Sequence, residues 1–115
     1  MGYTDYSDAS LTIALDINRR RWAADLLGDL GLNPDRMPTL LKGHDVRGRI
    51  TREAYRQTGL IAGTSVAMGG GDGACTARGA GVVEPGSAYC YIGSSAWVAQ
   101  LLDHPLLDPK ARIFN

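Results

Sequence analysis

The feature that most constrains this chain is the stretch TSVAMGGGDGACTARGAG at residues 64–81. A short apolar run is followed by three glycines, a single carboxylate, Asp72, and a segment of small residues. Each glycine costs backbone entropy on folding unless a positive φ or a close approach by another group requires it. The stretch therefore predicts a buried strand at residues 65–68, a tight loop to which another group comes close, and a helix beginning at or near Asp72.

Helix capping alone would explain Asp72, because the dipole and the free amides of a helix N-terminus favour a negative charge there. Capping does not explain why Gly69, Gly70 and Gly71 stand together. On residue types alone, we favour a functional loop over a purely structural one.

A second glycine turn follows in the stretch YIGSSAW, residues 91–97. Alternating residues before and after it predict two antiparallel strands, with Gly93, Ser94 and Ser95 forming the turn between them. Glycine lets backbone N–H groups face a ligand, and the two hydroxyls are small donors suited to phosphate oxygens. Taken by itself, the turn also fits an ordinary Gly-Ser hairpin.

Elsewhere the sequence predicts short elements with local start and stop signals. Asp5 or Ser7 caps a short helix from about residue 8, and a second, amphipathic helix runs from about residue 22 to Gly31. Residues 46–50 alternate as a half-buried strand does, and Thr51 opens a helix that ends near Gly59.

Composition excludes several classes of function. The 115 residues carry 12 basic and 12 acidic side chains, so no net charge favours binding to nucleic acid or to an anionic membrane. No apolar run approaches the roughly 20 residues of a membrane span, and we expect a cytoplasmic chain. Cys75 and Cys90 are expected to be buried free thiols, and no cluster of ligands at suitable spacing predicts a metal site.

Two mechanistic classes use loops of this kind. A dinucleotide-binding module would use Gly69, Gly71 and Ala74 as a G-x-G-x-x-A turn, but Asp72 would then direct a carboxylate at the pyrophosphate. A phosphotransferase fits better, because one carboxylate accepts the proton of an attacking hydroxyl while glycine amides and hydroxyls hold phosphates.

Three ordered blocks of the chain resemble the FGGY carbohydrate kinases, among them the xylulose kinases. The blocks are TDYSDAS with the following LTIALDINRRRWAADLLGDLGL, then DRMPTLLKGHDVRGRIT, and then GTSVAMGGGDGACTARGAGVVEPGSAYCYIGSSAW. The last is the most specific, since it resembles the family pattern G-x-x-V-x-x-GGGD-x-A…GAG-V-x-x-G…LGTS. The resemblance implies a fragment of the actin-like, ribonuclease-H-like two-domain sugar kinase fold.

The same resemblance implies an ATP- and Mg²⁺-dependent transfer of the γ-phosphoryl group to a sugar hydroxyl, with xylulose or a related ketopentose as the expected sugar. By position, Asp72 corresponds to the catalytic base, and Gly70 and Gly71 to the glycines that let the sugar approach it. Gly93, Ser94 and Ser95 correspond to the loop that contacts the phosphates of ATP. For Asp5, in the T-D motif, the sequence supports a capping role only.

The chain departs from the family pattern in several places. Gly73 stands where family members usually carry Gln or Asn, which affects sugar affinity or specificity, while Ser94 keeps the hydroxyl of the usual Thr. The N-terminal hairpin that holds phosphate and Mg²⁺ in the family has no counterpart here, so most Mg²⁺ ligands are expected outside this chain.

The chain is therefore expected to be an internal segment of a kinase, inactive by itself. Residues 1–62 would end the first, sugar-binding domain, and residues 63–115 would lead into the ATP-binding domain. Other segments of the same kinase, or a second copy, would cover its exposed edges. The alternative is a catalytically inactive relic or interaction module, which Gly73 and the missing Mg²⁺ hairpin favour.

Overall fold

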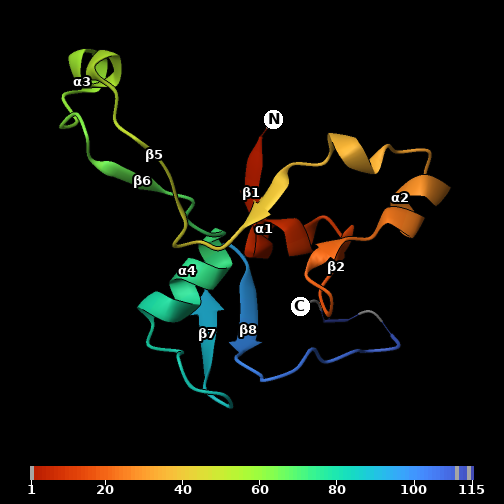
Figure 1. Cartoon of the computed structure of the whole chain (residues 1–115). Helices are drawn as coiled ribbons and strands as arrows, with labels where there is room; N and C mark the ends of the chain where they lie inside the picture. The colour runs from red at the N-terminus through yellow and green to blue at the C-terminus, as the bar shows by residue number, and fades with distance from the viewer. Residues whose placement is uncertain (1, 111, 114) are drawn as a thin grey trace.

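In a computed structural model of the chain, which describes residues 2–110, 112, 113 and 115, short strands pair two by two and helices join the pairs (Figure 1). The first part contains β1 (Tyr3–Asp5), α1 (Tyr6–Leu11), β2 (Leu15–Asp16), β3 (Arg21–Trp22), α2 (Ala24–Asp29), the 3-10 helix η1 (Pro34–Arg36) and β4 (Thr39–Leu41). Then follow β5 (Val46–Arg49), α3 (Arg52–Thr58), β6 (Ser65–Ala67), α4 (Asp72–Gly79), β7 (Ala88–Ile92) and β8 (Ala96–Gln100). The chain is α/β, as its sequence predicts.

The centre of the molecule is the parallel pair β1–β4, in which Asp5 lies opposite Leu41 (Figure 1). The antiparallel pair β2–β3 and helix α2 come between these strands in sequence. The Trp22 indole N–H donates to the Pro38 carbonyl at 2.8 Å and so connects β3 to the start of β4. Leu27 of α2 is buried, which gives this part a small apolar core.

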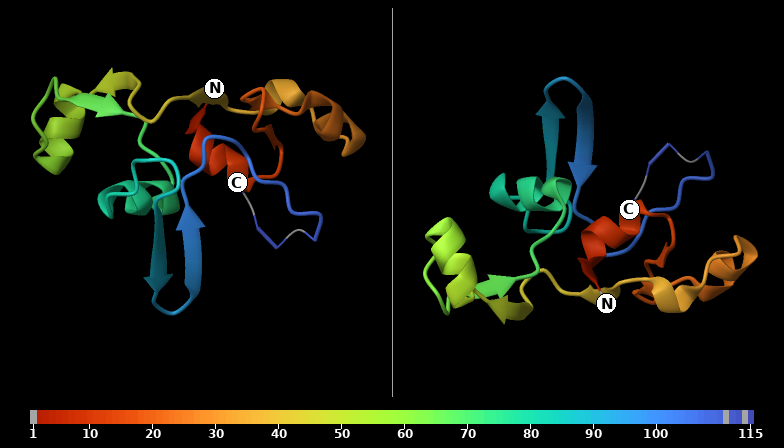
Figure 2. Two further views of the ribbon diagram at one scale, coloured as in Figure 1. Left: turned by 90° about the horizontal axis from the view of Figure 1, so that it is seen from below. Right: turned by 90° about the horizontal axis from the view of Figure 1, so that it is seen from above.

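Strands β5 and β6 pair antiparallel and carry α3 at their end, forming an arm that projects from the rest (Figures 1 and 2). The Thr51 hydroxyl caps α3 by accepting from the Ala54 N–H at 3.0 Å, and Gly59 ends the helix with a φ of +78°. Both helix boundaries are confirmed. They could be predicted because each depends on residues within one helical turn of one another.

Burial departs from the prediction. The strands expected to be half-buried at residues 46–50 and buried at residues 65–68 are exposed throughout β5 and β6, so these expectations are wrong. Cys75 and Cys90 are free thiols as predicted, but both are exposed rather than buried. The physical reason for β5 and β6 is that their two-stranded sheet has no second layer against it among the described residues. Cys75 and Cys90 lie on faces that the described residues leave exposed.

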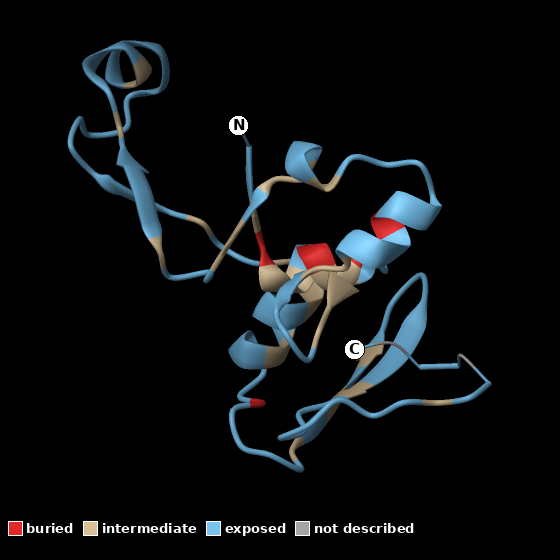
Figure 3. Ribbon diagram, turned by 45° about the vertical axis from the view of Figure 1, so that its right-hand side comes forward, coloured by how far each residue is buried: buried red, intermediate tan, exposed pale blue. Residues whose placement is uncertain are grey.

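The chain buries little of its apolar surface (Figure 3). Its accessible area is 8879 Å², whereas a compact protein of this mass exposes roughly 6,100 Å². Its radius of gyration is 17.2 Å, against about 13 Å for a compact chain of about 100 residues. Large side chains such as Ile92, Val98 and Leu107 are more than 70% exposed.

The arm meets the glycine loop through a close backbone approach. The Gly69 N–H donates to the Gly43 carbonyl at 2.9 Å, and the Met68 N–H donates to the Asp45 carbonyl at 3.0 Å. Gly69 has a φ of +82°, and a Cβ on Gly43 would lie 2.6 Å from the Gly69 carbonyl oxygen. Backbone cannot yield as a flexible side chain does, so position 43 requires glycine.

We expect Gly43→Ala to destabilise the fold by roughly 1–3 kcal/mol, because the new methyl group would push the loop that leads to Asp72. Gly28→Ala is the matched control, since a Cβ there meets nothing within 4 Å and alanine favours a helix by up to about 1 kcal/mol. Urea unfolding of both variants measures the difference, and a Gly43→Ala midpoint at or above that of the parent would contradict the expectation.

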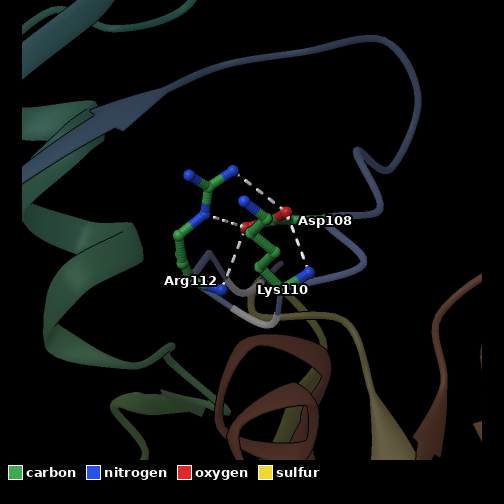
Figure 4. Close-up of polar contacts among 3 residues, drawn as sticks. All are labelled: Asp108, Lys110 and Arg112. Carbon is green, nitrogen blue, oxygen red and sulfur yellow. Dashed lines mark hydrogen bonds and ion pairs between the residues drawn. The ribbon is translucent and has the colours of Figure 1, made fainter.

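Asp108 organises a loop near the C-terminus (Figure 4). Its carboxylate accepts from the Arg112 Nε at 2.8 Å, from the Arg112 backbone N–H at 3.0 Å and from the Lys110 backbone N–H at 3.1 Å. The Arg112 side chain foremost, and then the Lys110 N–H, holds the pKa of Asp108 below its ordinary value of 3.8. The bonds therefore stabilise this loop fully above that ordinary value and are lost as the pH falls through the lowered pKa.

An acid titration followed by NMR should place the Asp108 midpoint below 3.8, with the Lys110 amide shifting at the same midpoint. Arg112→Ala should return the midpoint toward the ordinary value, because it removes the largest cause of the shift. A midpoint that Arg112→Ala leaves unchanged would show that the guanidinium is not the cause.

Candidate active site

Asp5 holds the first turn of α1, and it is the buried charged residue among the described part of the chain, at 4% exposure. Its Oδ1 accepts from the backbone N–H of Ser7 at 2.7 Å and also from the Ser7 hydroxyl. Of the two caps that the sequence allows, Asp5 is therefore the one used, and its capping role is confirmed. The Ser7 hydroxyl also has a second partner.

That partner is the glycine loop before Asp72. The Ser7 Oγ accepts from the Gly71 N–H at 2.8 Å, although the two residues are 64 positions apart. The Cys75 thiol lies 3.4 Å from the Gly70 carbonyl, to which it donates. The peptide unit between Gly70 and Gly71 is thus held at its carbonyl by α4 and at its N–H by α1.

The first turn of α1 lies against two of the glycines. A Cβ on Gly71 would lie 2.7 Å from the Asp8 Oδ1 and 3.3 Å from the Ser7 Oγ. A Cβ on Gly70 would lie 3.4 Å from the Ser7 Oγ. The predicted close approach is therefore real, and the group that approaches is the first turn of α1.

Asp72 is the first residue of α4, and Gly71 is its N-cap, as the sequence predicts to within a residue. The Asp72 Oδ1 accepts from the Gly73 N–H at 2.8 Å, and the side chain is exposed. Within the described part of the chain, its second carboxylate oxygen has no hydrogen-bond or ion-pair partner. An exposed carboxylate with one oxygen free can accept a proton from a bound hydroxyl.

The turn formed by Gly93, Ser94 and Ser95 joins β7 to β8, as predicted. A Cβ on Gly93 would lie within 2.9 Å of the Tyr91 ring, and that ring stacks on Trp97 at 3.9 Å between centroids. A side chain at position 93 would therefore displace the Tyr91 ring from its place on Trp97. Both serines are exposed, and their hydroxyls bond to none of the described residues.

Tyr89 attaches this hairpin to α4. Its hydroxyl lies 3.4 Å from the Gly73 carbonyl, to which it donates, and accepts from the Trp97 indole at 3.0 Å. Gly73, next to the candidate base, thus lies near the base of the hairpin, while the turn at 93–95 stands at its free end (Figure 2). The structure brings Gly70, Gly71 and Asp72 together and leaves the serine turn apart from them.

One hollow lies between α1 and the β2–β3 hairpin and another between α4 and β8, and Asp72 lines neither of these two. Among the described residues no group of three potential ligands is placed to hold a metal ion, and no helix is long and apolar enough to cross a bilayer.

Sequence reasoning missed the residues that hold the loop. The sequence predicts Ser7 as a possible helix cap and Cys75 as a free thiol, and it gives no role to Tyr89 beyond its strand. Ser7 lies 64 positions from its partner Gly71, and Tyr89 lies 16 positions from its partner Gly73. Cys75 lies 5 positions from its partner Gly70. A single sequence has no local signal for the longer two.

The chain is similar to known carbohydrate kinases. Residues 2–79 match the N-terminal domain of the FGGY family of carbohydrate kinases. The chain is 35% identical to a xylulose kinase of Bacillus subtilis over 96% of its own length and 22% of that protein. It is 38% identical to an autoinducer-2 kinase of Yersinia enterocolitica over 92% of its length and 20% of that protein.

Among solved structures, a ligand-bound xylulose kinase from Lactobacillus acidophilus shares the fold, with a TM-score of 0.90 and 24% identity. The match covers 97% of this chain and 23% of that one. The chain thus spans about a fifth of the length of the curated relatives it matches. With the matched residues including β1, α1, the glycine loop and α4, the chain belongs to the FGGY family of carbohydrate kinases.

Proposed function

We propose that this chain is part of an ATP-dependent carbohydrate kinase that transfers the γ-phosphoryl group to a sugar hydroxyl. The observation that carries the proposal is the exposed Asp72 carboxylate at the start of α4, in a segment that matches this family. In the loop before it, hydrogen bonds hold both the N–H and the carbonyl of the Gly70–Gly71 peptide, so the backbone from which the Asp72 side chain projects is fixed. A fixed base is what proton transfer requires.

In the proposed reaction, Asp72 accepts the proton of the substrate hydroxyl as that oxygen forms a bond to the γ-phosphorus. The bond between the γ-phosphorus and the bridging oxygen breaks, and ADP leaves with that oxygen and its charge. We assign Gly70 and Gly71 to the sugar site because they directly precede Asp72 in the loop that matches the family. A Cβ at Gly73 would meet nothing within 4 Å, which leaves further room beside the base.

We assign Gly93, Ser94 and Ser95 to the phosphates of ATP. The turn has two unpaired hydroxyls and no carboxylate, so its chemistry suits an anionic ligand. ATP enters with Mg²⁺, as the family implies. The described residues hold no group of three ligands that fits a metal ion, so no step and no ligand is assigned to Mg²⁺ here.

Domain placement and partners are part of the proposal. Residues 1–62 belong to the end of the sugar-binding domain, and residues 63–115 lead into the ATP-binding domain. We assign the kinase to the cytoplasm. The exposed strands and apolar side chains are covered by further segments of the same kinase, or by a second copy when the 115-residue chain is alone. If native mass spectrometry of the 115-residue chain alone shows a monomer, that result would count against covering by a second copy.

The competing functions differ in their support. A dinucleotide-binding module needs parallel strands on either side of its helix, whereas β6 pairs antiparallel with β5 and β7 pairs antiparallel with β8. An inactive relic is favoured by Gly73, which has no side chain to bond to a substrate or nucleotide where family members usually carry Gln or Asn. Activity decides between the relic and the kinase.

The first measurement is ADP release from MgATP with and without D-xylulose, in the longest reading frame that contains residues 1–115 and, beside it, in the 115-residue chain alone. We expect sugar-dependent release from the longer protein only, because the segment lacks much of what its relatives contain. A panel of pentoses, hexoses and polyols identifies the sugar. No release with any of them would support the relic or interaction module.

Asp72→Asn should lower sugar-dependent kcat by roughly 10²-fold or more with little change in KM, because the amide keeps the shape but accepts no proton. Asp25→Asn is the matched control, since Asp25 also lies in the first turn of a helix and is far from this loop in sequence. Equal turnover of Asp72→Asn and the parent would remove Asp72 from the mechanism.

A further inference from the structure

We propose that Asp5 and Ser7 are positioning residues: the buried carboxylate orients the Ser7 hydroxyl, and that hydroxyl fixes the Gly70–Gly71 peptide from which Asp72 projects. The inference rests on the proposed function only where it concerns turnover. The fixing of the peptide itself can be measured without any activity.

The first step concerns the single proton of the Ser7 hydroxyl. A serine hydroxyl donates one hydrogen bond and accepts through its lone pairs. The Ser7 hydroxyl donates its hydrogen bond to the Asp5 Oδ1, which also accepts from the Ser7 backbone N–H at 2.7 Å. The lone pairs are therefore free to accept from the Gly71 N–H, at 2.8 Å.

The second step concerns the burial of Asp5. At 4% exposure the carboxylate is shielded from water, so its bonds to Ser7 do not compete with solvent as surface bonds do. A charged acceptor also polarises the hydroxyl that donates to it, which makes the oxygen a better acceptor for Gly71. The three groups form a chain of hydrogen bonds in one direction, from Gly71 to Ser7 to Asp5.

The third step concerns how the fixed Gly70–Gly71 peptide positions Asp72. The Gly70–Gly71 peptide is held at its N–H by Ser7 and at its carbonyl by the Cys75 thiol, at 3.4 Å. Glycines have the widest backbone freedom of any residue, so a loop of three needs external bonds to keep one conformation. With this peptide plane fixed, few backbone torsions separate it from the Asp72 carboxylate.

The test compares Ser7→Ala, Ser7→Thr and Ser10→Ala in the longest reading frame that contains this segment. Ser7→Ala removes the acceptor of the Gly71 N–H, whereas Ser7→Thr keeps a hydroxyl. Ser10→Ala is the matched control, because Ser10 also lies in α1 and its hydroxyl donates to the Ser7 carbonyl at 2.7 Å without reaching the loop. Asp5→Asn keeps a helix cap, so α1 is retained when the charge is removed.

Two readouts are needed. Amide hydrogen exchange at Gly71, resolved by residue, should rise about tenfold in Ser7→Ala and remain near the parent in Ser7→Thr and Ser10→Ala. The kcat for sugar-dependent ADP release should fall roughly 10- to 100-fold in Ser7→Ala with KM for ATP unchanged, and Ser7→Thr should restore it. Adding Asp5→Asn to Ser7→Ala should cause no further loss, because both act through one oxygen.

Unchanged exchange at Gly71 in Ser7→Ala would overturn the inference. So would faster exchange with full turnover, in a kinase that Asp72→Asn inactivates. Failure of the proposed function has a different signature, namely full turnover in Asp72→Asn itself, and it leaves the exchange at Gly71 as an independent measure of the fixed peptide.

Discussion

The hydrogen bond from the Gly71 N–H to the Ser7 hydroxyl joins the two parts of the chain on which the candidate site depends. The Asp5 cap orients the hydroxyl, and a Cβ at position 71 would lie 2.7 Å from the Asp8 Oδ1 and 3.3 Å from the Ser7 Oγ, so a larger residue there would displace side chains of the first turn of α1. Helix α4 begins directly after it, and the hairpin is attached to α4 through Tyr89. Without this contact, the loop that carries Asp72 would be connected to the first part mainly through the arm.

Local structure could be predicted well because its causes are local. Thr51 and Gly59 bound a helix through bonds to residues no more than four positions away, and the turn between β7 and β8 follows from its glycine and serines. Burial could not be predicted in this way. The alternation in β5 shows which side chains suit a covered face, but it does not show whether a covering layer is present, and none of the described residues supplies one.

Glycine patterns indicated a close approach without identifying the group that approaches. At Gly71 that group is the first turn of α1, and at Gly93 it is the ring of Tyr91 stacked on Trp97. Neither glycine therefore supports a ligand by its conformation alone. The weight of the kinase proposal rests on the exposed carboxylate of Asp72, the unpaired hydroxyls of the serine turn, and the family to which the chain belongs.

The separation of base and turn sets a geometric requirement on the proposed reaction. Tyr89 contacts the residue next to Asp72, and the turn begins four residues later, about 13 Å along an extended strand. A triphosphate held by Ser94 and Ser95 must therefore extend back along the hairpin, so that its γ end approaches the N-terminus of α4. In the proposed reaction the positive end of the α4 dipole attracts the phosphate, while Asp72 repels it and accepts the proton. The sugar hydroxyl that reacts in this proposal is the one held between that γ end and Asp72.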